Sequence, residues 1–405
     1  MSPSCVAHPL PILRRLAALL LATLVAACGG GVDTGGTGAP TQSYSSGRIS
    51  GFGSIVVNGV HFDESDASIV DDDGATHHRS ELRLGMTVDV QAGPIAADAG
   101  TGVLRSAASR IEFGSEIKGP VERVDVAAGT LRVLGQSLMV DVNTVFDGYA
   151  SGLAGVQPSQ LVEVFAFFDP ASGVYTATRI ERESALSAYK LRGPIANLDT
   201  GAKTFAIGGA SISYAGITAA ALPGLANGTT ARVQLQTAQQ AGRWVATRIR
   251  TGLPGIADGL DAEVEGYVTD FASLADFKVR GVSVDASGAG VVFVKGGAAQ
   301  IVNGARIEVE GHMQAGMLVA TKVEVKKKRG GNDEDEQEFE FDGTIDSVDL
   351  TGKSFVVRDT VITFDAATTF SRGSADDLRV GARVEVKGVL AGGQQVRAKK
   401  IKFES

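Results

Sequence analysis

One short pattern occurs five times along this chain, and this repetition constrains the fold more than any other feature. An apolar residue is followed three positions later by glycine, and alternating apolar residues come next. The copies read Leu82, Gly85, Val88, Val90; Val156, Ser159, Val162, Val164, with serine in place of glycine; Leu225, Gly228, Ala231, Val233; Ile301, Gly304, Ile307, Val309; and Leu378, Gly381, Val384, Val386. Self-similarity at a regular spacing is typical of tandem copies of one structural unit.

The two ends of the copies are also alike. Four copies open with glycine followed two positions later by an apolar residue, in Gly119-Pro120-Val121, Gly193-Pro194-Ile195, Gly266-Tyr267-Val268 and Gly343-Thr344-Ile345. The copies close with small, polar, basic and apolar residues, and their final apolar positions are Ile111, Ile180, Ile249, Val323 and Ile401. These final positions lie 69 to 78 residues apart, so each copy has the length of one small domain.

Within a copy the hydrophobic period is two, which indicates strands with one buried face. Val384 and Val386, for example, alternate with Arg383, Glu385 and Lys387. Turn signals interrupt the alternation at Asp72-Asp73-Gly74, Ala128-Gly129, Thr200-Gly201, Thr351-Gly352 and Gly392-Gly393. We therefore expect about five strands per copy and no long helix, with short helical turns near residues 80–84 and 374–378.

The expected fold is all-β, built from tandem small five-stranded antiparallel barrels that resemble the OB-fold. A unit of this size buries only about 60% of its unfolded surface, and closing the sheet removes exposed strand edges. Small β-sandwiches are the alternative, and a continuous solenoid is a third option. The predicted segments are a signal peptide at 1–27, a lipidated cysteine and flexible tether at 28–46, repeats at 47–114, 115–186, 187–254, 260–326 and 338–405, and a charged linker at 327–337.

The N-terminus predicts export and lipid attachment. Arg14 and Arg15 precede an apolar run that begins at Leu16, and small residues lead to a cleavage site between Ala27 and Cys28. Cysteine at this place resembles the lipobox of bacterial lipoproteins, so we expect Cys28 to carry a lipid. A transmembrane anchor is the alternative, but 12 apolar residues are fewer than the roughly 20 that a spanning helix needs.

The stretch from Gly53 to Asp63, followed by Leu82 to Val90, resembles the bacterial repeat family named domain of unknown function 5666. Proteins of this family are typically envelope lipoproteins with several tandem copies. The resemblance therefore implies a modular protein at the cell envelope, most simply the outer membrane because Gly29 follows Cys28. It implies no activity and no cofactor.

Charge and motifs exclude several classes of function. Removing residues 1–27, which hold two arginines and no acidic residue, takes the formal net charge from −8 to −10. An acidic chain is a poor partner for nucleic acid. The chain has two cysteines, Cys5 and Cys28, so cleavage and lipidation leave no thiol for a disulfide, catalysis or metal binding. No nucleophile elbow, phosphate loop, zinc motif or dinucleotide fingerprint is present, and we predict no catalytic residue.

The weak candidates for a metal site lie in the first copy. Asp71-Asp72-Asp73-Gly74 is similar to a calcium loop, but Ile69 and Ser80 occupy positions that should be acidic, and an acidic hairpin turn is the simpler interpretation. A weak zinc or copper site would use Asp71, Asp73, His61 and His77. Elsewhere, Asp63, Asp141 and Asp365 follow strands, where a carboxylate typically accepts backbone N–H groups of the next turn.

These features favour a non-enzymatic module of the cell envelope. Its partners would be the membrane, through the lipid on Cys28, and an envelope protein or a glycan. A small-ligand or metal-binding envelope protein is the alternative. A hydrolase with an unrecognised carboxylate pair is a third possibility, because paired acids leave no local signature.

Overall fold

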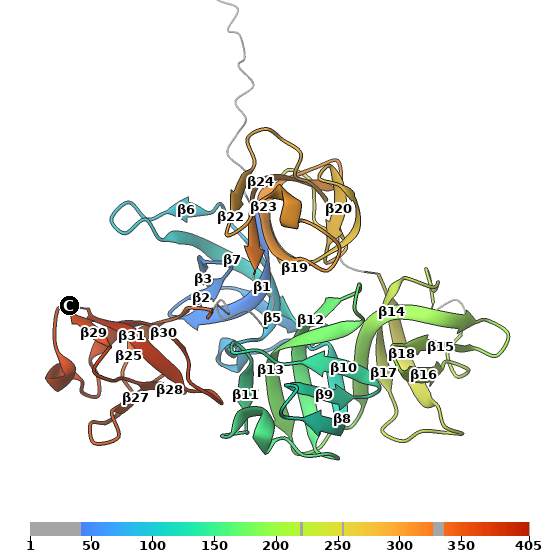
Figure 1. Cartoon of the computed structure of the whole chain (residues 1–405), viewed down its shortest axis with the longest axis horizontal. Helices are drawn as coiled ribbons and strands as arrows, with labels where there is room; N and C mark the ends of the chain where they lie inside the picture. The colour runs from blue at the N-terminus through green and yellow to red at the C-terminus, as the bar shows by residue number, and fades with distance from the viewer. Residues whose placement is uncertain (1–41, 219–221, 253–254, 327–335, 405) are drawn as a thin grey trace, which may run out of the picture. The chain divides into compact units, whose positions relative to one another are not determined.

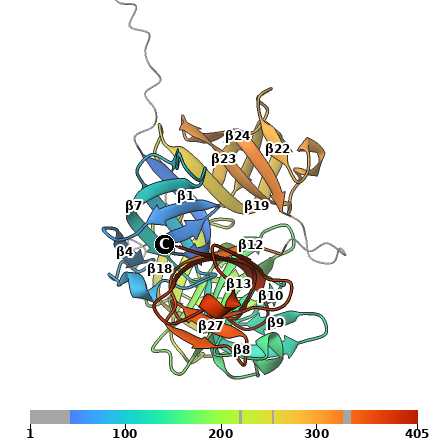
Figure 2. The same ribbon diagram turned by 90° about the vertical axis from the view of Figure 1, so that its left-hand side faces the viewer.

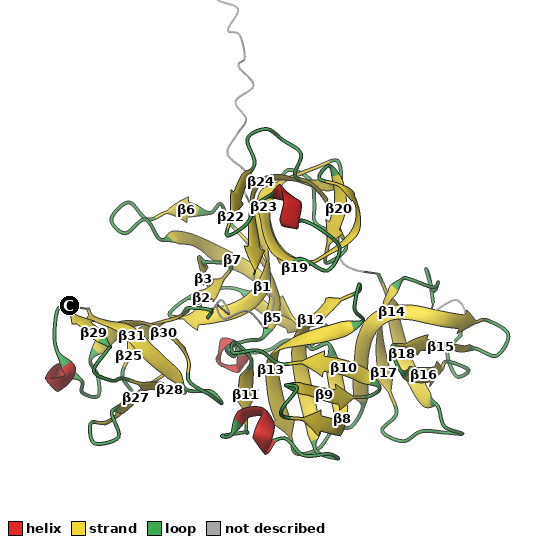
Figure 3. Ribbon diagram, in the orientation of Figure 1, coloured by secondary structure: helices red, strands yellow, loops and turns green. Residues whose placement is uncertain are grey.

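The computed structural model describes residues 42–218, 222–252, 255–326 and 336–404. These residues form β-strands and short 3₁₀ helices (Figure 3). The predicted signal peptide, the cleavage site, Cys28 and most of the tether lie outside the described residues. Within the described part, no helix is long and apolar enough to cross a bilayer.

The strands of the first copy close into a ring, here named barrel 1. Strand β1 pairs with β2 and β5, β2 pairs with β3, and β7 pairs with β3 and β5. The bounds are β1 Ser43–Phe52, β2 Ile55–Val57, β3 Val60–Asp63, β5 Thr87–Ala92 and β7 Leu104–Phe113. All pairings in the ring are antiparallel except β3 with β7, which is parallel.

The same ring recurs in the other four copies, named barrels 2 to 5. Barrel 2 contains β8 Ile117–Asp125, β9 Thr130–Val133, β10 Gln136–Met139, β12 Leu161–Asp169 and β13 Val174–Glu183. Barrel 3 contains β14 Tyr189–Asp199, β15 Thr204–Ile207, β16 Ala210–Ser213, β17 Thr230–Leu235 and β18 Trp244–Thr251. Figure 1 shows strands of both barrels in green and yellow.

Barrel 4 contains β19 Asp261–Ser273, β20 Asp276–Val279, β21 Val282–Asp285, β23 Arg306–Gln314 and β24 Met317–Lys326. In barrel 5 the first strand is interrupted, giving β25 Phe339–Thr344 and β26 Ser347–Asp349, followed by β27 Ser354–Val357, β28 Thr360–Thr363, β30 Arg383–Leu390 and β31 Val396–Phe403. Figure 1 shows barrel 4 nearly end-on, and Figure 2 shows barrel 5 nearly end-on.

Short elements complete the barrels. Strands β4 Ser68–Asp71, β11 Val145–Asp147, β22 Val292–Val294 and β29 Thr369–Ser371 each pair in parallel with the last strand of their barrel. Strand β6 is Ala96–Ala97, and the 3₁₀ helices span Arg79–Glu81, Gly152–Gly155, Ala298–Gln300 and Ala375–Asp377.

The all-β fold with tandem OB-like five-stranded barrels is therefore confirmed. It differs from the expectation in one respect, because each ring contains one parallel pair. The chain crosses the barrel between its third and fourth strands, and the last strand then runs in the same direction as the third.

The structure explains the glycine of the repeated pattern. Gly85, Gly228, Gly304 and Gly381 have φ between 76° and 86°, and Ser159 takes the same conformation at 72°. In every copy the N–H of this residue donates to a carbonyl of the first strand, at Ile49, Val121, Ile195, Val268 or Ile345. Glycine is favoured because left-handed backbone is strained for other residues. The repeated sequence pattern therefore marks the turn that leads into the fourth strand of each barrel.

The hydrophobic cores are shared between some of the copies. One core joins buried residues of barrels 1 and 5 with Val145 and Phe165 of barrel 2, a second joins barrels 2 and 3, and a third belongs to barrel 4. Strand β1 also pairs in parallel with β19 over Ser43–Ser46 and with β25 over Gly51–Phe52. Residues Ser43–Ser46 pair with both β5 and β19, so the first strand begins at Ser43, inside the segment 28–46 that we expected to be a flexible tether.

Most of the predicted charged linker at 327–337 lies outside the described residues. Its last residue, Gln337, donates from its backbone nitrogen to Asn143 Oδ1 at 2.7 Å and accepts a hydrogen bond from Arg48 at 2.6 Å. This end of the segment is therefore held against the barrels and is not surrounded by solvent as we expected.

Candidate functional site

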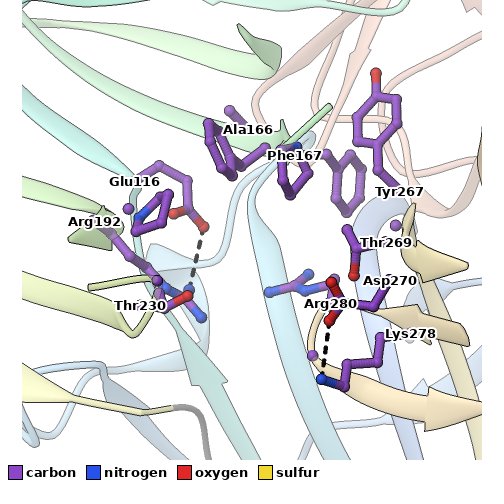
Figure 4. Close-up of a pocket in the computed structure, with 17 residues that line it drawn as sticks. Glu116, Ala166, Phe167, Arg192, Thr230, Tyr267, Thr269, Asp270, Lys278 and Arg280 are labelled. Atoms are coloured by element: carbon purple, nitrogen blue, oxygen red, sulfur yellow. Dashed lines mark hydrogen bonds and ion pairs between the residues drawn. The ribbon is translucent and has the colours of Figure 1, made fainter. Parts of the chain in front are cut away.

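A cavity of about 320 Å³ lies where residues of barrels 2, 3 and 4 meet (Figure 4). Barrel 2 contributes Ala166, Phe167 and Phe168 from β12, and barrel 3 contributes Arg192 to Pro194 from β14 and Thr230 from β17. Barrel 4 contributes residues of β19 and the turn between β20 and β21. Its volume is at the low end of the range for pockets that hold small organic ligands.

The glycines that open each copy leave room for a neighbouring side chain to lie over the first strand of the barrel. A Cβ on Gly119 would lie 2.6 Å from Cγ of Leu134, and a Cβ on Gly266 would lie 2.6 Å from Cγ of Arg280. In both barrels the crossing side chain comes from the turn between the second and third strands. Gly266 therefore lets the Arg280 side chain lie across β19, beside the cavity.

Arg280 occupies an unusual backbone conformation for an arginine. Arg280 and Gly281 have φ of 49° and 81°, and Asn58 and Gly59 have φ of 51° and 82° at the equivalent turn of barrel 1. Positive φ at both central residues is typical of type I′ hairpin turns, where Asn-Gly is favoured. A side chain other than glycine in this region costs about 1–2 kcal/mol, and asparagine tolerates it best. The backbone conformation of the turn therefore does not explain why residue 280 is an arginine.

One nitrogen of the Arg280 guanidinium group has no hydrogen-bond acceptor, although the charge of Arg280 acts on the Tyr44 hydroxyl. This nitrogen, Nη1, is buried and forms no hydrogen bond, and Arg280 forms no ion pair within the described residues. Its Cζ lies 5.7 Å from the centre of the Phe167 ring, which Arg306 approaches at 4.6 Å. The aromatic ring gives the cation a favourable face but provides no hydrogen-bond acceptor.

The other charged groups in the cavity wall are matched. Arg192 Nη1 lies 3.2 Å from Glu116 Oε1, and Lys278 Nζ lies 2.9 Å from Asp270 Oδ2. Burial alone would lower the pKa of Arg192, but nearby carboxylates, led by Glu116, raise it above its usual value. Three cations and two carboxylates line the cavity, so one positive charge, that of Arg280, remains unmatched.

The metal candidates from the sequence do not form one cluster. His77 Nδ1 lies 2.9 Å from Glu81, and its Nε2 lies 3.3 Å from Asp71, beside a second cavity of about 550 Å³. The hydrogen bond with Glu81 is the main cause of a raised pKa at His77. His61 is instead 3.6 Å from Glu340 of barrel 5.

Asp73, the remaining metal candidate, faces barrel 3. It accepts a hydrogen bond from Gln234 Nε2 at 2.8 Å and lies 3.6 Å from Arg248. Across the described ranges, no group of three or more His, Cys, Asp or Glu side chains is arranged to hold a metal ion.

The acidic hairpin has a role that the sequence did not suggest. Asp71 Oδ1 accepts hydrogen bonds from the backbone of Asp73 and Ala75, as a tight turn requires. Its neighbour Asp72 is buried, pairs with Lys190 and lies 3.0 Å from Arg232 Nε. The hairpin of barrel 1 is thereby bound to barrel 3.

The three strand-end aspartates behave as we expected. Carboxylate oxygens of Asp63, Asp141 and Asp365 accept hydrogen bonds from the backbone nitrogen two residues later, at 2.8 to 3.0 Å. They stabilise turns and do not form a shared ligand set.

Sequence reasoning missed Arg280 as a candidate. The only available signal was an Arg-Gly pair at the place where barrel 1 has Asn58-Gly59, and that equivalence depends on the strand register. The unmatched charge could not be recognised before the walls of the cavity were known.

Three segments of the chain match the family model described as "Domain of unknown function (DUF5666)", at residues 118–181, 265–324 and 342–402. These segments fall in barrels 2, 4 and 5, so the expected resemblance to tandem copies of this domain is confirmed for these barrels, whereas the stretch from Gly53 to Val90 in barrel 1 lies outside the matched segments. No curated protein matches the chain. Among solved structures, "drosophila Unr CSD456" is similar at 11% identity, with 72% of this chain and 97% of that chain covered and a TM-score of 0.13.

Proposed function

We propose that this chain, which carries tandem copies of DUF5666, is a non-enzymatic binding protein of the cell envelope. In this proposal a lipid on Cys28 holds the protein at the membrane, most simply the outer membrane. The barrels then present the cavity between barrels 2, 3 and 4 to a glycan residue or a small ligand of similar size.

The observation that carries this proposal is the unmatched cation in the cavity wall. Arg280 has a buried nitrogen without an acceptor, beside the aromatic ring of Phe167. Buried polar groups in native proteins are nearly always hydrogen-bonded, so a donor left open in a cavity supports a binding role.

The same cavity gives less support to a hydrolase. Its two carboxylates, Glu116 and Asp270, are each held by a cation, at 3.2 Å and 2.9 Å. A carboxylate that acts as a general base must be able to take a proton from substrate or water. Here both groups neutralise neighbouring side chains, which favours binding over bond cleavage.

The binding proposal is tested by filling the cavity. Thr230→Phe places a ring at the cavity wall, and Thr247→Phe is a matched control because Thr247 is exposed on the neighbouring strand β18. Detergent-extracted full-length proteins are screened by thermal shift against neutral and acidic monosaccharides and small ring compounds. We expect wild type and Thr247→Phe to respond to the same compounds and Thr230→Phe to lose the response. Equal responses in all three proteins would contradict the proposal.

The anchoring proposal has its own test. Cys28→Ser removes the acceptor of the lipid and leaves every described residue unchanged. After fractionation of a bacterial host with an outer membrane, we expect wild type in the detergent-soluble membrane fraction and the variant in the periplasmic extract. A wild-type protein found mainly in the periplasmic extract would contradict lipid anchoring.

A further inference from the structure

We infer that the cavity between barrels 2, 3 and 4 selects a ligand carrying one carboxylate on a small ring, and that Arg280 receives this carboxylate. The inference rests on the proposed binding function and adds the chemical class of the ligand. Two sources share this chemistry, namely an acidic sugar residue of a glycan and a free aromatic acid. The experiment below separates them.

The first argument is the unsatisfied donor. Nη1 of Arg280 is buried without a hydrogen bond. Leaving such a donor unpaired is unfavourable, and more so when the group is charged. A carboxylate is the natural acceptor, because its two oxygens match the planar fork of a guanidinium group.

The residue at the same turn differs between the barrels. Barrel 1 has Asn58, which donates to Ser45 Oγ at 3.1 Å and to the Ser46 carbonyl at 3.2 Å. Barrel 5 has Arg358, which lies 3.7 Å from Glu64. Both of these turn residues have polar partners within the protein. Arg280 takes the same strained backbone without one, so we assign its partner to a bound molecule.

The third argument is the charge and shape of the site. Figure 4 shows the Arg192–Glu116 pair on one side of the opening and Arg280, Asp270 and Lys278 on the other. Asp89 helps to raise the pKa of Arg192, but it does not balance the charge of Arg280, because Asp89 and Arg280 form no ion pair in the described structure. One unmatched cation favours a ligand with a single negative charge, because a second charge would meet Glu116 or Asp270.

The remaining wall suits a ring. Phe167, Phe168, Pro170 and Pro194 supply apolar surface, and the volume of about 320 Å³ limits the ligand to small molecules. Sugar rings and aromatic rings both have faces that pack against such surface. The carboxylate would lie at Arg280, and the ring would contact the apolar side chains.

The test measures binding of matched probe pairs by calorimetry on the detergent-extracted full-length protein. The pairs are glucuronate with glucose and benzoate with benzamide, so each acid has a neutral counterpart of similar size. We expect at least one acid to bind, and to bind about tenfold or more tightly than its counterpart. Binding by glucuronate would identify the glycan source, and binding by benzoate alone would identify a free acid.

Two variants connect the binding to Arg280. Arg280→Asn removes the guanidinium and installs the residue that barrel 1 uses at this turn, so the fold is preserved. Arg358→Asn makes the same change at the equivalent turn of barrel 5. We expect Arg280→Asn to weaken acid binding on the order of 10- to 100-fold, and Arg358→Asn to leave it unchanged.

The results separate this inference from the proposed function. If neither acid binds, if both neutral compounds bind as tightly as their acids, or if Arg280→Asn binds the acids like wild type, the inference is overturned. If neutral compounds bind and Thr230→Phe abolishes their binding, the proposed binding function stands without the carboxylate. The melting temperature of Arg280→Asn should be at least that of wild type, which confirms that a loss of binding is not a loss of fold.

Discussion

Two buried glutamates on β19 show how strongly the surroundings of one residue set its chemistry. Burial raises the pKa of Glu263 to about 8, and the neighbouring Glu308 and Glu310 add to the rise. Burial would also raise the pKa of Glu265, but Arg306, Arg48 and Lys326 outweigh it and lower the value to about 2. Arg306 donates to Glu265 Oε1 at 2.7 Å, whereas Glu263 accepts a hydrogen bond from the neutral Ser45 hydroxyl at 3.2 Å.

The Glu263 carboxyl should make the protein less stable at alkaline pH. Its folded pKa of about 8 lies above the ordinary value of 4.5, so its contribution to stability is full below pH 4.5 and is lost as pH rises through 8. Glu265 acts at the opposite end, because its contribution is present above pH 4.5 and is lost as pH falls toward 2. We expect the free energy of unfolding in urea to fall between pH 6 and 8.5, and Glu263→Gln to reduce this slope.

Asp276→Asn is the matched control, because Asp276 is an exposed carboxylate on the neighbouring strand β20. It should leave the alkaline slope as it is in wild type. If Glu263→Gln and Asp276→Asn had the same slope, Glu263 would not be protonated in the folded protein near neutral pH.

Single-residue environments were the part of this protein that the sequence could least predict. The local hydrogen bonds of Asp63, Asp141 and Asp365 followed from their positions at strand ends, because each donor lies two residues away. Asp72 and Lys190, by contrast, meet across 118 residues, and nothing near either residue indicates the other. The unpaired nitrogen of Arg280 could not be predicted either, because the cavity around it is formed by residues of three barrels.

At the scale of elements, the hairpin at residues 71–75 connects two barrels through buried charge. Asp72 pairs with Lys190 on β14, and the Asp72 carbonyl accepts hydrogen bonds from Arg232 and Arg250 at 2.6 Å. Burial lowers the pKa of Lys190 even though Asp72 opposes this effect. A buried ion pair stabilises the protein only while both partners are present, because removing one leaves the other charge buried and uncompensated.

Asp72→Ala should therefore destabilise the protein by about 3–5 kcal/mol, because it leaves a buried lysine uncompensated. The free energy of unfolding in urea measures the effect. Adding Lys190→Met should recover part of the loss, since the second change removes one of the two cations that pair with Asp72, whereas Arg232 remains. Asp98→Ala is the control, because exposed Asp98 holds only its own turn through Gly100 and Thr101. Equal losses for Asp72→Ala and Asp98→Ala would show that the hairpin is not bound to barrel 3.

Elements were also where the sequence was most informative. The period of two and the turn signals led to about five strands per copy, which is the number in each ring. The bulge in the last strand of every barrel was not predicted; its extra residue is Ser109, Thr178, Thr247, Thr321 or Lys399. A bulge adds one residue without changing composition, so alternation alone does not reveal it.

At the scale of the whole molecule, the repeats are not independent. Barrels 1 and 5 are separated in sequence by barrels 2, 3 and 4, yet they share one core, which also includes Val145 and Phe165 of barrel 2. Pairing of β1 with both β19 and β25 joins the first copy to the last two. The sequence predicted five units but not these contacts, because tandem order says little about which units share a core.

We propose that three barrels together form a binding site for a small carboxylate, and hydrogen–deuterium exchange can detect the bound ligand in each barrel. Exchange of the full-length protein is compared with and without a saturating acid, either glucuronate or benzoate. We predict slower exchange in one segment from each barrel, residues 166–170 of barrel 2, 192–194 of barrel 3 and 278–281 of barrel 4, because these segments line one cavity. Unchanged exchange in all three segments, or protection confined to residues 71–81 at the second cavity, would contradict the claim.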